Sequence, residues 1–266
     1  MEATLEQVSV FEQAPGELEG MPGWFNALRQ EGWKRFQELD MPSRHDEQWR
    51  FAKLKQLNFE GVRFPDAEPS AAHRGAAGLE KRAARFGFIN DTLNEAESNL
   101  PDEVICLPLE QALAEHGELV EQYFMKSEAT LGSAKFAALH QAHLLTGMFI
   151  HVPDNVQIAE PIEVFHWLSG DHIITFPHTL VVTGTNAQVT VVDYFQSDTT
   201  ARDSWAIAMN DLVAGPGSQL NYLALQALCD EARLIQVNNT TVARYATAKS
   251  FVLNVGAAWA RQESLS

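Results

Sequence analysis

Strand-like segments end at nearly regular intervals over the second half of the chain, and this repeat limits the possible folds more than any other feature. The strands end at Val152, Val182, Val213 and Val242, at intervals of 30, 31 and 29 residues, and turn sequences follow them. A unit of this length cannot bury its apolar face alone, so a fixed period predicts a solenoid in which each unit stacks on its neighbours. Each repeat holds two strands. Apolar residues on both faces, as in 189–192 and 220–225, favour strands covered on both sides, but the pattern leaves a sandwich and a parallel β-helix open.

The chain changes character near residue 146. Before it, helical spacing of apolar residues predicts helices over 21–39, from Leu109 onward and over 133–145, with short strands at 86–89 and 104–107. The segment 65–78 is rich in Ala, Pro and Gly and is expected to be a loop. We therefore predict a mainly helical domain over 1–146 and a β domain over 147–266. After Gly147 the strand-like segments are 188–195, 205–213, 219–227, 234–243 and 250–255.

The last residues contain no visible capping element. A turn is predicted over 256–259, and 261–266 is a polar segment. Because a stacked β array normally needs a cap, we expect this chain to be the front part of a longer protein, with an incomplete β domain that tends to self-associate.

Composition narrows the function classes. The 266 residues are 45% hydrophobic and carry a formal net charge of −16, which is typical of a globular chain and disfavours binding to nucleic acid or to an anionic membrane surface. No apolar run approaches the ~20 residues that span a bilayer, and the acidic N-terminus does not resemble a signal peptide. We expect a cytoplasmic protein. Its two cysteines have no metal-binding spacing, which argues against a disulfide framework or a zinc site.

Two groups of histidines invite a metal-binding interpretation. His140 and His143 lie one helical turn apart, but they share a stripe with Phe136 and Leu139 and lack a third ligand nearby in the sequence. His166, His172 and His178 surround a turn at 170–171 and only loosely match a metal-binding β-barrel signature. We therefore expect all five to be structural.

Carboxylates and thiols give a second set of candidates. The aspartates that a polysaccharide-cleaving β-helix could use, through calcium or acid–base chemistry, are Asp193, Asp198, Asp203 and Asp211. Most lie in or beside a predicted loop over 196–203, so solvated loop carboxylates are the simpler interpretation. Cys229 precedes two acidic residues, whose charge disfavours a nucleophilic thiolate, and Cys106 lies in an apolar segment. We predict no catalytic, cofactor-binding or metal-binding residue.

Three stretches resemble the SufB/SufD family of iron–sulfur cluster assembly scaffolds, with the closer likeness to SufD. Residues 42–51, PSRHDEQWRF, are similar to the family's early P-x-R-x-x-E-x-W-[RK]-[YF] segment. Residues 135–140, 147–156 and 160–162 resemble its entry into the β domain, although His140 stands where the family has Asn. The apolar strands after Pro177 are a looser match.

The resemblance implies an N-terminal helical domain, a right-handed parallel β-helix with two coils in each repeat, and a C-terminal helical domain beyond this chain. It also implies a non-enzymatic scaffold subunit that works with a SufB-like subunit and a SufC-like ATPase, in which the complex, and not this fragment, handles the iron–sulfur cluster. The alternatives are a carbohydrate-active β-helix enzyme, which needs carboxylates stacked on one exposed face, and a passive β-solenoid interaction module.

Overall fold

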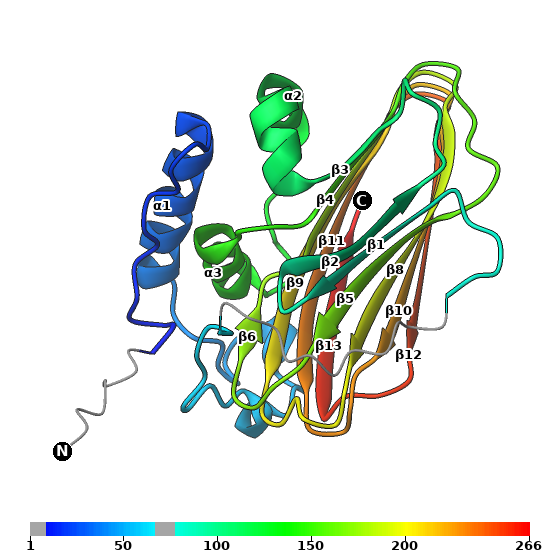
Figure 1. Cartoon of the computed structure of the whole chain (residues 1–266). Coiled ribbons are helices and arrows are strands. Elements are labelled where there is room, and N and C mark those ends of the chain that lie inside the picture. The colour runs from blue at the N-terminus through cyan, green and yellow to red at the C-terminus, as the bar shows by residue number, and fades with distance from the viewer. Residues whose placement is uncertain (1–8, 67–77) are drawn as a thin grey trace.

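Helices pack against one side of a flattened β-solenoid in the computed structural model of the chain (Figure 1). The structure describes residues 9–66 and 78–266, so most of the loop predicted over 65–78 lies outside it. The helices are α1 (Gly23–Glu38), α2 (Leu109–Tyr123) and α3 (Ala134–His143), with short 3₁₀ turns at Glu47–Trp49 and Leu54–Gln56. All three predicted helices are confirmed.

The solenoid consists of two sheets whose strands alternate along the chain. The six-stranded sheet has the order β12-β10-β8-β5-β1-β2, and the seven-stranded sheet has the order β13-β11-β9-β7-β4-β3. From β4 onward the neighbours within each sheet are parallel. The strand bounds are Ala84–Ile89 (β1), Thr92–Ser98 (β2), Ile105–Pro108 (β3), Met148–Val152 (β4), Ile162–Leu168 (β5), Ile174–Thr175 (β6), His178–Thr183 (β7), Gln188–Ser197 (β8), Trp205–Ala214 (β9), Gln219–Ala227 (β10), Arg233–Val242 (β11), Thr247–Asn254 (β12) and Trp259–Leu265 (β13).

Each repeat of about 30 residues is one coil of the solenoid. Val182 pairs with Val213 in the next strand of the same sheet, so one full circuit takes 31 residues and contributes one strand to each sheet. The parallel β-solenoid is confirmed, but the expectation of two coils in each repeat is wrong. The strands are long, and two of them with their turns use the whole repeat.

The repeat shortens in the last coils, which changes one predicted alignment. Val213 pairs with Thr241, so Val242 lies opposite Ala214 and its side chain points to the other face of the sheet from Val213. The nearly regular spacing of Val182, Val213 and Val242 predicts that their side chains stack in phase along one wall of the solenoid, and this is wrong for Val242. Successive side chains in a strand alternate between faces, so this offset of one residue places Val242 on the face of Ala214, which belongs to the interior cluster, and not on the helix side with Val182.

Stacked turns at one end of the coils explain part of the sequence repeat. Asn155, Asn186 and Gly217 occupy the third position of successive turns and all have positive φ. Asn186 Nδ2 donates to Asn155 Oδ1 (3.3 Å), which extends the stacking to the side chains. A Cβ at residue 217 would lie 2.5 Å from Asn186 Oδ1, so glycine fits both the backbone conformation and the close packing.

Strands occur before the predicted β domain and also after the last strand predicted within it. The predicted strands at 86–89 and 104–107 correspond to β1 and β3, which join the two sheets of the solenoid, whereas the hairpin strand β2 was not predicted. The polar segment predicted over 261–266 is largely strand β13, which pairs with β11. Alternating polar residues such as Gln262 and Ser264 conceal a strand in a sequence pattern. The division at residue 146 stays a prediction, because the helices and β1–β3 pack directly against the coils.

Two packed layers hold the helices and the solenoid together. The interior between the sheets is filled by apolar side chains of nearly every coil, including Val164, Val191 and Leu220. On the outer face of the seven-stranded sheet, Phe136 and Leu139 of α3 pack with Trp205 and Ile207 of β9, and Trp33 of α1 joins the same cluster. Gly32 lets α1 approach α3 closely, since a Cβ there would lie 2.8 Å from the Ala142 nitrogen.

Candidate functional site

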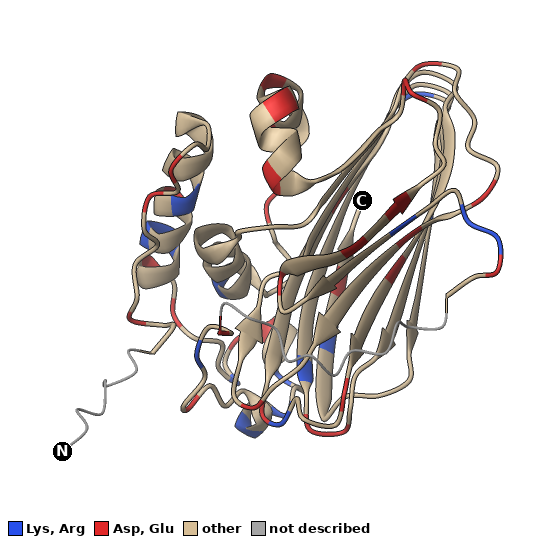
Figure 2. Ribbon diagram, in the orientation of Figure 1, with Lys and Arg blue, Asp and Glu red and all other residues tan. Residues whose placement is uncertain are grey.

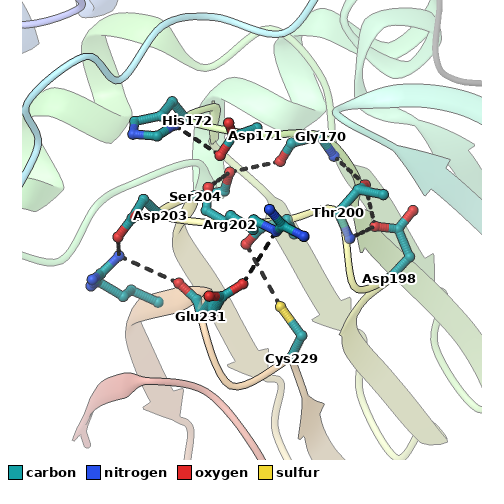
Figure 3. Close-up of polar contacts among 12 residues, drawn as sticks. Gly170, Asp171, His172, Asp198, Thr200, Arg202, Asp203, Ser204, Cys229 and Glu231 are labelled. Atoms are coloured by element: carbon teal, nitrogen blue, oxygen red, sulfur yellow. Dashed lines mark hydrogen bonds and ion pairs between the residues drawn. The ribbon is translucent and has the colours of Figure 1, made fainter.

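Loops between successive coils bring several of the predicted candidates to one end of the solenoid. His172 lies in the first loop, Asp198 and Asp203 in the second, and Cys229 in the third (Figure 3). These loop residues lie close together because residues about one coil apart in the sequence become neighbours in a solenoid.

We call the polar residues of these three loops the turn cluster, and they form hydrogen bonds and ion pairs with one another. The Gly170 N–H donates to Thr200 Oγ1 (3.0 Å), and Ser204 Oγ donates to the Gly170 carbonyl (2.8 Å). Asp198 accepts from Ser169 Oγ (2.6 Å) and from the Thr200 N–H (2.8 Å), and these hydrogen bonds hold the pKa of Asp198 below its usual value against the effect of burial. The carboxylate therefore stabilises loops. It is not a free ligand.

The remaining members of the turn cluster are also used within it. Asp203 forms an ion pair with Arg233 (2.9 Å), and Glu231 lies 3.5 Å from Arg202. The His172 ring contacts Asp171 (2.8 Å). Cys229 is half-buried, and its thiol donates to the Ala201 carbonyl at 3.6 Å (Figure 3). Within the described residues, no three His, Cys, Asp or Glu side chains form a group that could hold a metal ion.

A second polar cluster lies between the two sheets, and the sequence did not reveal most of it. Asp193 is fully buried and accepts hydrogen bonds from Thr179 Oγ1 (3.0 Å) and the Tyr222 hydroxyl (2.8 Å). His166 Nε2 lies 3.1 Å from its other oxygen. Burial and the Asp193 charge raise the pKa of Tyr222 well above its usual value, so the phenol remains a donor. The sequence signal for this cluster is a polar residue in the middle of neighbouring apolar strands, such as His166 in β5 and Asp193 in β8.

The interior cluster continues into the next coils through amide side chains. Asn210 Nδ2 donates to the Tyr222 hydroxyl (2.6 Å) and to Asn238 Oδ1 (2.7 Å), and Gln236 Nε2 also contacts Asn238 Oδ1 (3.2 Å). Asn210 and Asn238 are paired neighbours in the seven-stranded sheet. A hydrogen-bonded ladder of this kind ties the strand register to specific partners, because a slip would leave buried polar groups without them.

A third cluster lies on the opposite face of the seven-stranded sheet, beneath the helices. His140 of α3 contacts His178 of β7, and His178 Nε2 lies 3.5 Å from Asp211 Oδ2 of β9. All three side chains are buried. Of the four candidate aspartates, Asp193 therefore faces the interior, Asp211 faces the helices, and Asp198 and Asp203 lie in a loop. They do not form the exposed carboxylate row that a polysaccharide-cleaving enzyme would need.

The remaining candidates, His143 and Cys106, are buried among packed side chains. His143 is surrounded by the rings of Trp33, Phe64 and Phe176, and burial together with the charge of Arg29 lowers its pKa to about 4. It is kept neutral inside an aromatic cage. Burial raises the pKa of the Cys106 thiol, which agrees with an inert apolar role. Both side chains are buried, as the sequence predicted.

A buried ion pair on the outer face of the six-stranded sheet was also missed by the sequence. Glu163 accepts from Arg85 Nη2 (2.8 Å), the Tyr194 hydroxyl (2.9 Å) and the Leu79 N–H (2.7 Å). These bonds join β1, β5 and β8, so they connect the strands before residue 147 to the coils. The ion pair at Glu163, like the polar clusters described above, holds neighbouring strands in position.

The fold and its polar clusters define a class of protein: a helix-flanked parallel β-solenoid whose buried polar side chains hold coils and helices in register. Family models assign it further. The model for the SufBD protein N-terminal region matches residues 82–164, and the model for the SUF system FeS cluster assembly SufBD core domain matches residues 166–266. The chain belongs to the SufBD family.

Curated relatives agree with this assignment. The chain is 26% identical over 224 residues to an iron–sulfur cluster assembly protein SufD of Bacillus subtilis, an alignment that covers 78% of this chain and 49% of the relative. It is 24% identical over 252 residues to an iron–sulfur cluster assembly SufBD family protein of Staphylococcus haemolyticus, with 83% and 53% covered. The chain thus spans about half the length of the curated relatives it matches.

Proposed function

We propose that this chain is a SufD-like scaffold component that assists iron–sulfur cluster assembly together with a SufB-like subunit and a SufC-like ATPase. The observation that carries the proposal is the consecutive match of the two SufBD models, whose junction at residues 164–166 falls inside strand β5 of one continuous sheet. The family match therefore follows the solenoid itself and is not confined to a single motif.

The physical contribution of this chain would be a rigid arm. Ladder hydrogen bonds and buried polar clusters link successive coils, and α1 and α3 are fixed to the solenoid through a shared aromatic cluster. A rigid body of this kind can transmit a movement that ATP binding and hydrolysis produce in a partner. No catalytic role is assigned to a residue of this chain, and the iron–sulfur cluster is the cargo of the assembled complex.

A cytoplasmic location is part of the same proposal. Among the described residues, no helix has the length and apolar character needed to cross a membrane. Acidic residues are spread over the helices and loops (Figure 2), and α2 contains Glu110, Glu115, Glu118 and Glu121 without a lysine or arginine. Such a surface fits protein partners better than nucleic acid.

Assembly with partners is the first test. The chain is co-expressed with the SufB-like and SufC-like proteins of the same source, and a tag on the SufC-like protein is used for capture, followed by size-exclusion chromatography with light scattering. We expect one peak that contains all three chains in fixed proportion. The matched control lacks the SufB-like protein. Elution of this chain alone in both experiments would contradict the scaffold proposal.

Cluster content is the second test, and it separates this chain from the complex. Anaerobic reconstitution with iron and sulfide should leave the isolated chain without stoichiometric iron, because Cys106 is buried and Cys229 is engaged in the turn cluster. The complex should retain iron and sulfide. Near-stoichiometric iron on the isolated chain that is lost in Cys229→Ser would show that the chain itself binds the cluster.

A further inference from the structure

A linear chain of buried polar groups connects α3 to the seven-stranded sheet and then to the segment after α2. His140 Nδ1 lies 2.7 Å from the Ile207 carbonyl oxygen, and His140 Nε2 lies 3.2 Å from His178 Nδ1. His178 Nε2 lies 3.5 Å from Asp211 Oδ2, and the same carboxylate oxygen accepts the Met125 N–H at 2.8 Å.

The partners determine where the protons lie. A carbonyl oxygen only accepts, so His140 must carry its proton on Nδ1, which leaves Nε2 of the neutral ring as an acceptor. His178 Nδ1 must then donate to it. Burial and the neighbouring His178 lower the pKa of His140 well below its usual value, which agrees with a neutral His140 ring.

This assignment leaves a conflict at the other side of His178. If His178 were neutral with its proton on Nδ1, the lone pair of Nε2 would face an ionised carboxylate oxygen inside the protein. No described residue forms a hydrogen bond with Nε2, and two acceptors in contact away from water are costly. One additional proton between the two groups removes the conflict.

We infer that the His178–Asp211 pair holds one extra proton and thereby forms a proton-dependent latch between the solenoid and the helices. The groups that face His178 are His140 from α3, Asp211 from β9, and the Phe124 ring from the segment after α2, with ring centroids 4.6 Å apart. Asp211 also accepts from Asn239 Nδ2 of β11 (3.3 Å) and lines a cavity of about 230 Å³ beside Lys126, which gives the proton a path to solvent.

Release of the proton would weaken the attachment of the helical segment. Asp211 then becomes a buried carboxylate whose Oδ2 faces the lone pair of His178 Nε2. The same Oδ2 accepts the Met125 N–H, so repulsion between the two acceptors acts on this hydrogen bond to the segment after α2. The latch is therefore closed while the proton is bound and loosens as the pH rises. The first elements affected should be the residues after α2 and the C-terminal turn of α3.

Nuclear magnetic resonance of the full chain with ¹⁵N-labelled histidine and ¹³C-labelled aspartate tests the proton directly. At pH 7.5 we expect His140 protonated only on Nδ1, and His178 either protonated on both nitrogens or bonded to a protonated Asp211. Raising the pH should release one proton and reduce hydrogen-exchange protection of the Met125 amide about tenfold, after correction for the intrinsic exchange rate.

Two variants distinguish the latch from simple packing. In His140→Phe, His178 loses its acceptor and is free to become a neutral ring that donates from Nε2 to Asp211. In Asp211→Asn, the anion is gone and His178 should be neutral at pH 7.5. His172, a half-buried residue of the turn cluster, is replaced by Gln as the control, and this change should leave the His178 signals unchanged. A wild-type His178 that is neutral at pH 7.5 beside an ionised Asp211, in either tautomer, would overturn the inference.

Discussion

His143 shows how a single buried side chain can make stability depend on pH. Burial and the charge of Arg29 lower its pKa to about 4, whereas the unfolded chain takes up the proton near pH 6.5. The folded state therefore favours the neutral ring, and stability is lost as the pH falls through this range. In His143→Phe, which keeps an aromatic ring among Trp33, Phe64 and Phe176, the free energy of unfolding should lose about 2 kcal/mol less than the wild type between pH 7 and pH 5. Urea unfolding at both pH values measures this. Equal losses in the two proteins would show that His143 does not titrate differently on folding. Burial raises the pKa of Asp91 to about 6, but both proteins contain Asp91, so its contribution to the pH dependence cancels in the comparison.

Strand register decides the energetic role of each repeated valine. Val182 is 2% exposed and packs with Phe149 and Leu180 beneath the helices, whereas Val242 lies on the other face of the sheet, at the exposed end of β11, and is 46% exposed. Val182→Ala should reduce the free energy of unfolding by about 1 to 3 kcal/mol, and Val242→Ala, the matched control with the same chemical change, by less than about 0.5 kcal/mol. Chemical denaturation of the two variants measures how well each valine is packed. Similar losses for both would mean that Val242 is as well packed as Val182.

The whole molecule combines a strongly negative charge with an exposed apolar strip. Phe251 and Leu253 of β12 are 57% and 45% exposed and lie beside Leu223 and Leu225 of β10 on the outer face of the six-stranded sheet. The net charge of −16 keeps molecules apart at low salt, but at ~0.15 M salt the Debye length is only about 8 Å. We therefore expect self-association that increases with added salt, as measured by light scattering. A Phe251→Ser, Leu253→Ser double variant should remain monomeric, whereas Leu93→Ser on the distant strand β2 should behave as the wild type. A monomer at high salt and high concentration, or unchanged association of the double variant, would refute this role of the strip.

Much of the fold could be predicted from local patterns. Helical spacing identified α1, α2 and α3, and dense Val, Leu and Ile segments identified β8 to β12, because these patterns depend on residues within one element. Strand β13 and hairpin strand β2 were missed, since both are largely polar and owe their conformation to a neighbouring strand. The partners of the candidate histidines and aspartates were not foreseen, because they come from residues far apart in the sequence.

The sequence by itself determined that the chain stacks two-strand repeats into a solenoid with helices before it, because the period and the apolar pattern are properties of consecutive residues. Tertiary structure alone decided which side chains meet. His140 and His178 come from a helix and a strand 38 residues apart, and Asp193 and Tyr222 come from different coils. Whether Val242 lies on the same face of the sheet as Val213 depends on a shift of one residue between strands. Pairings of this kind follow from register and packing, in which one residue of offset reverses the face of a side chain, and no local pattern records that offset.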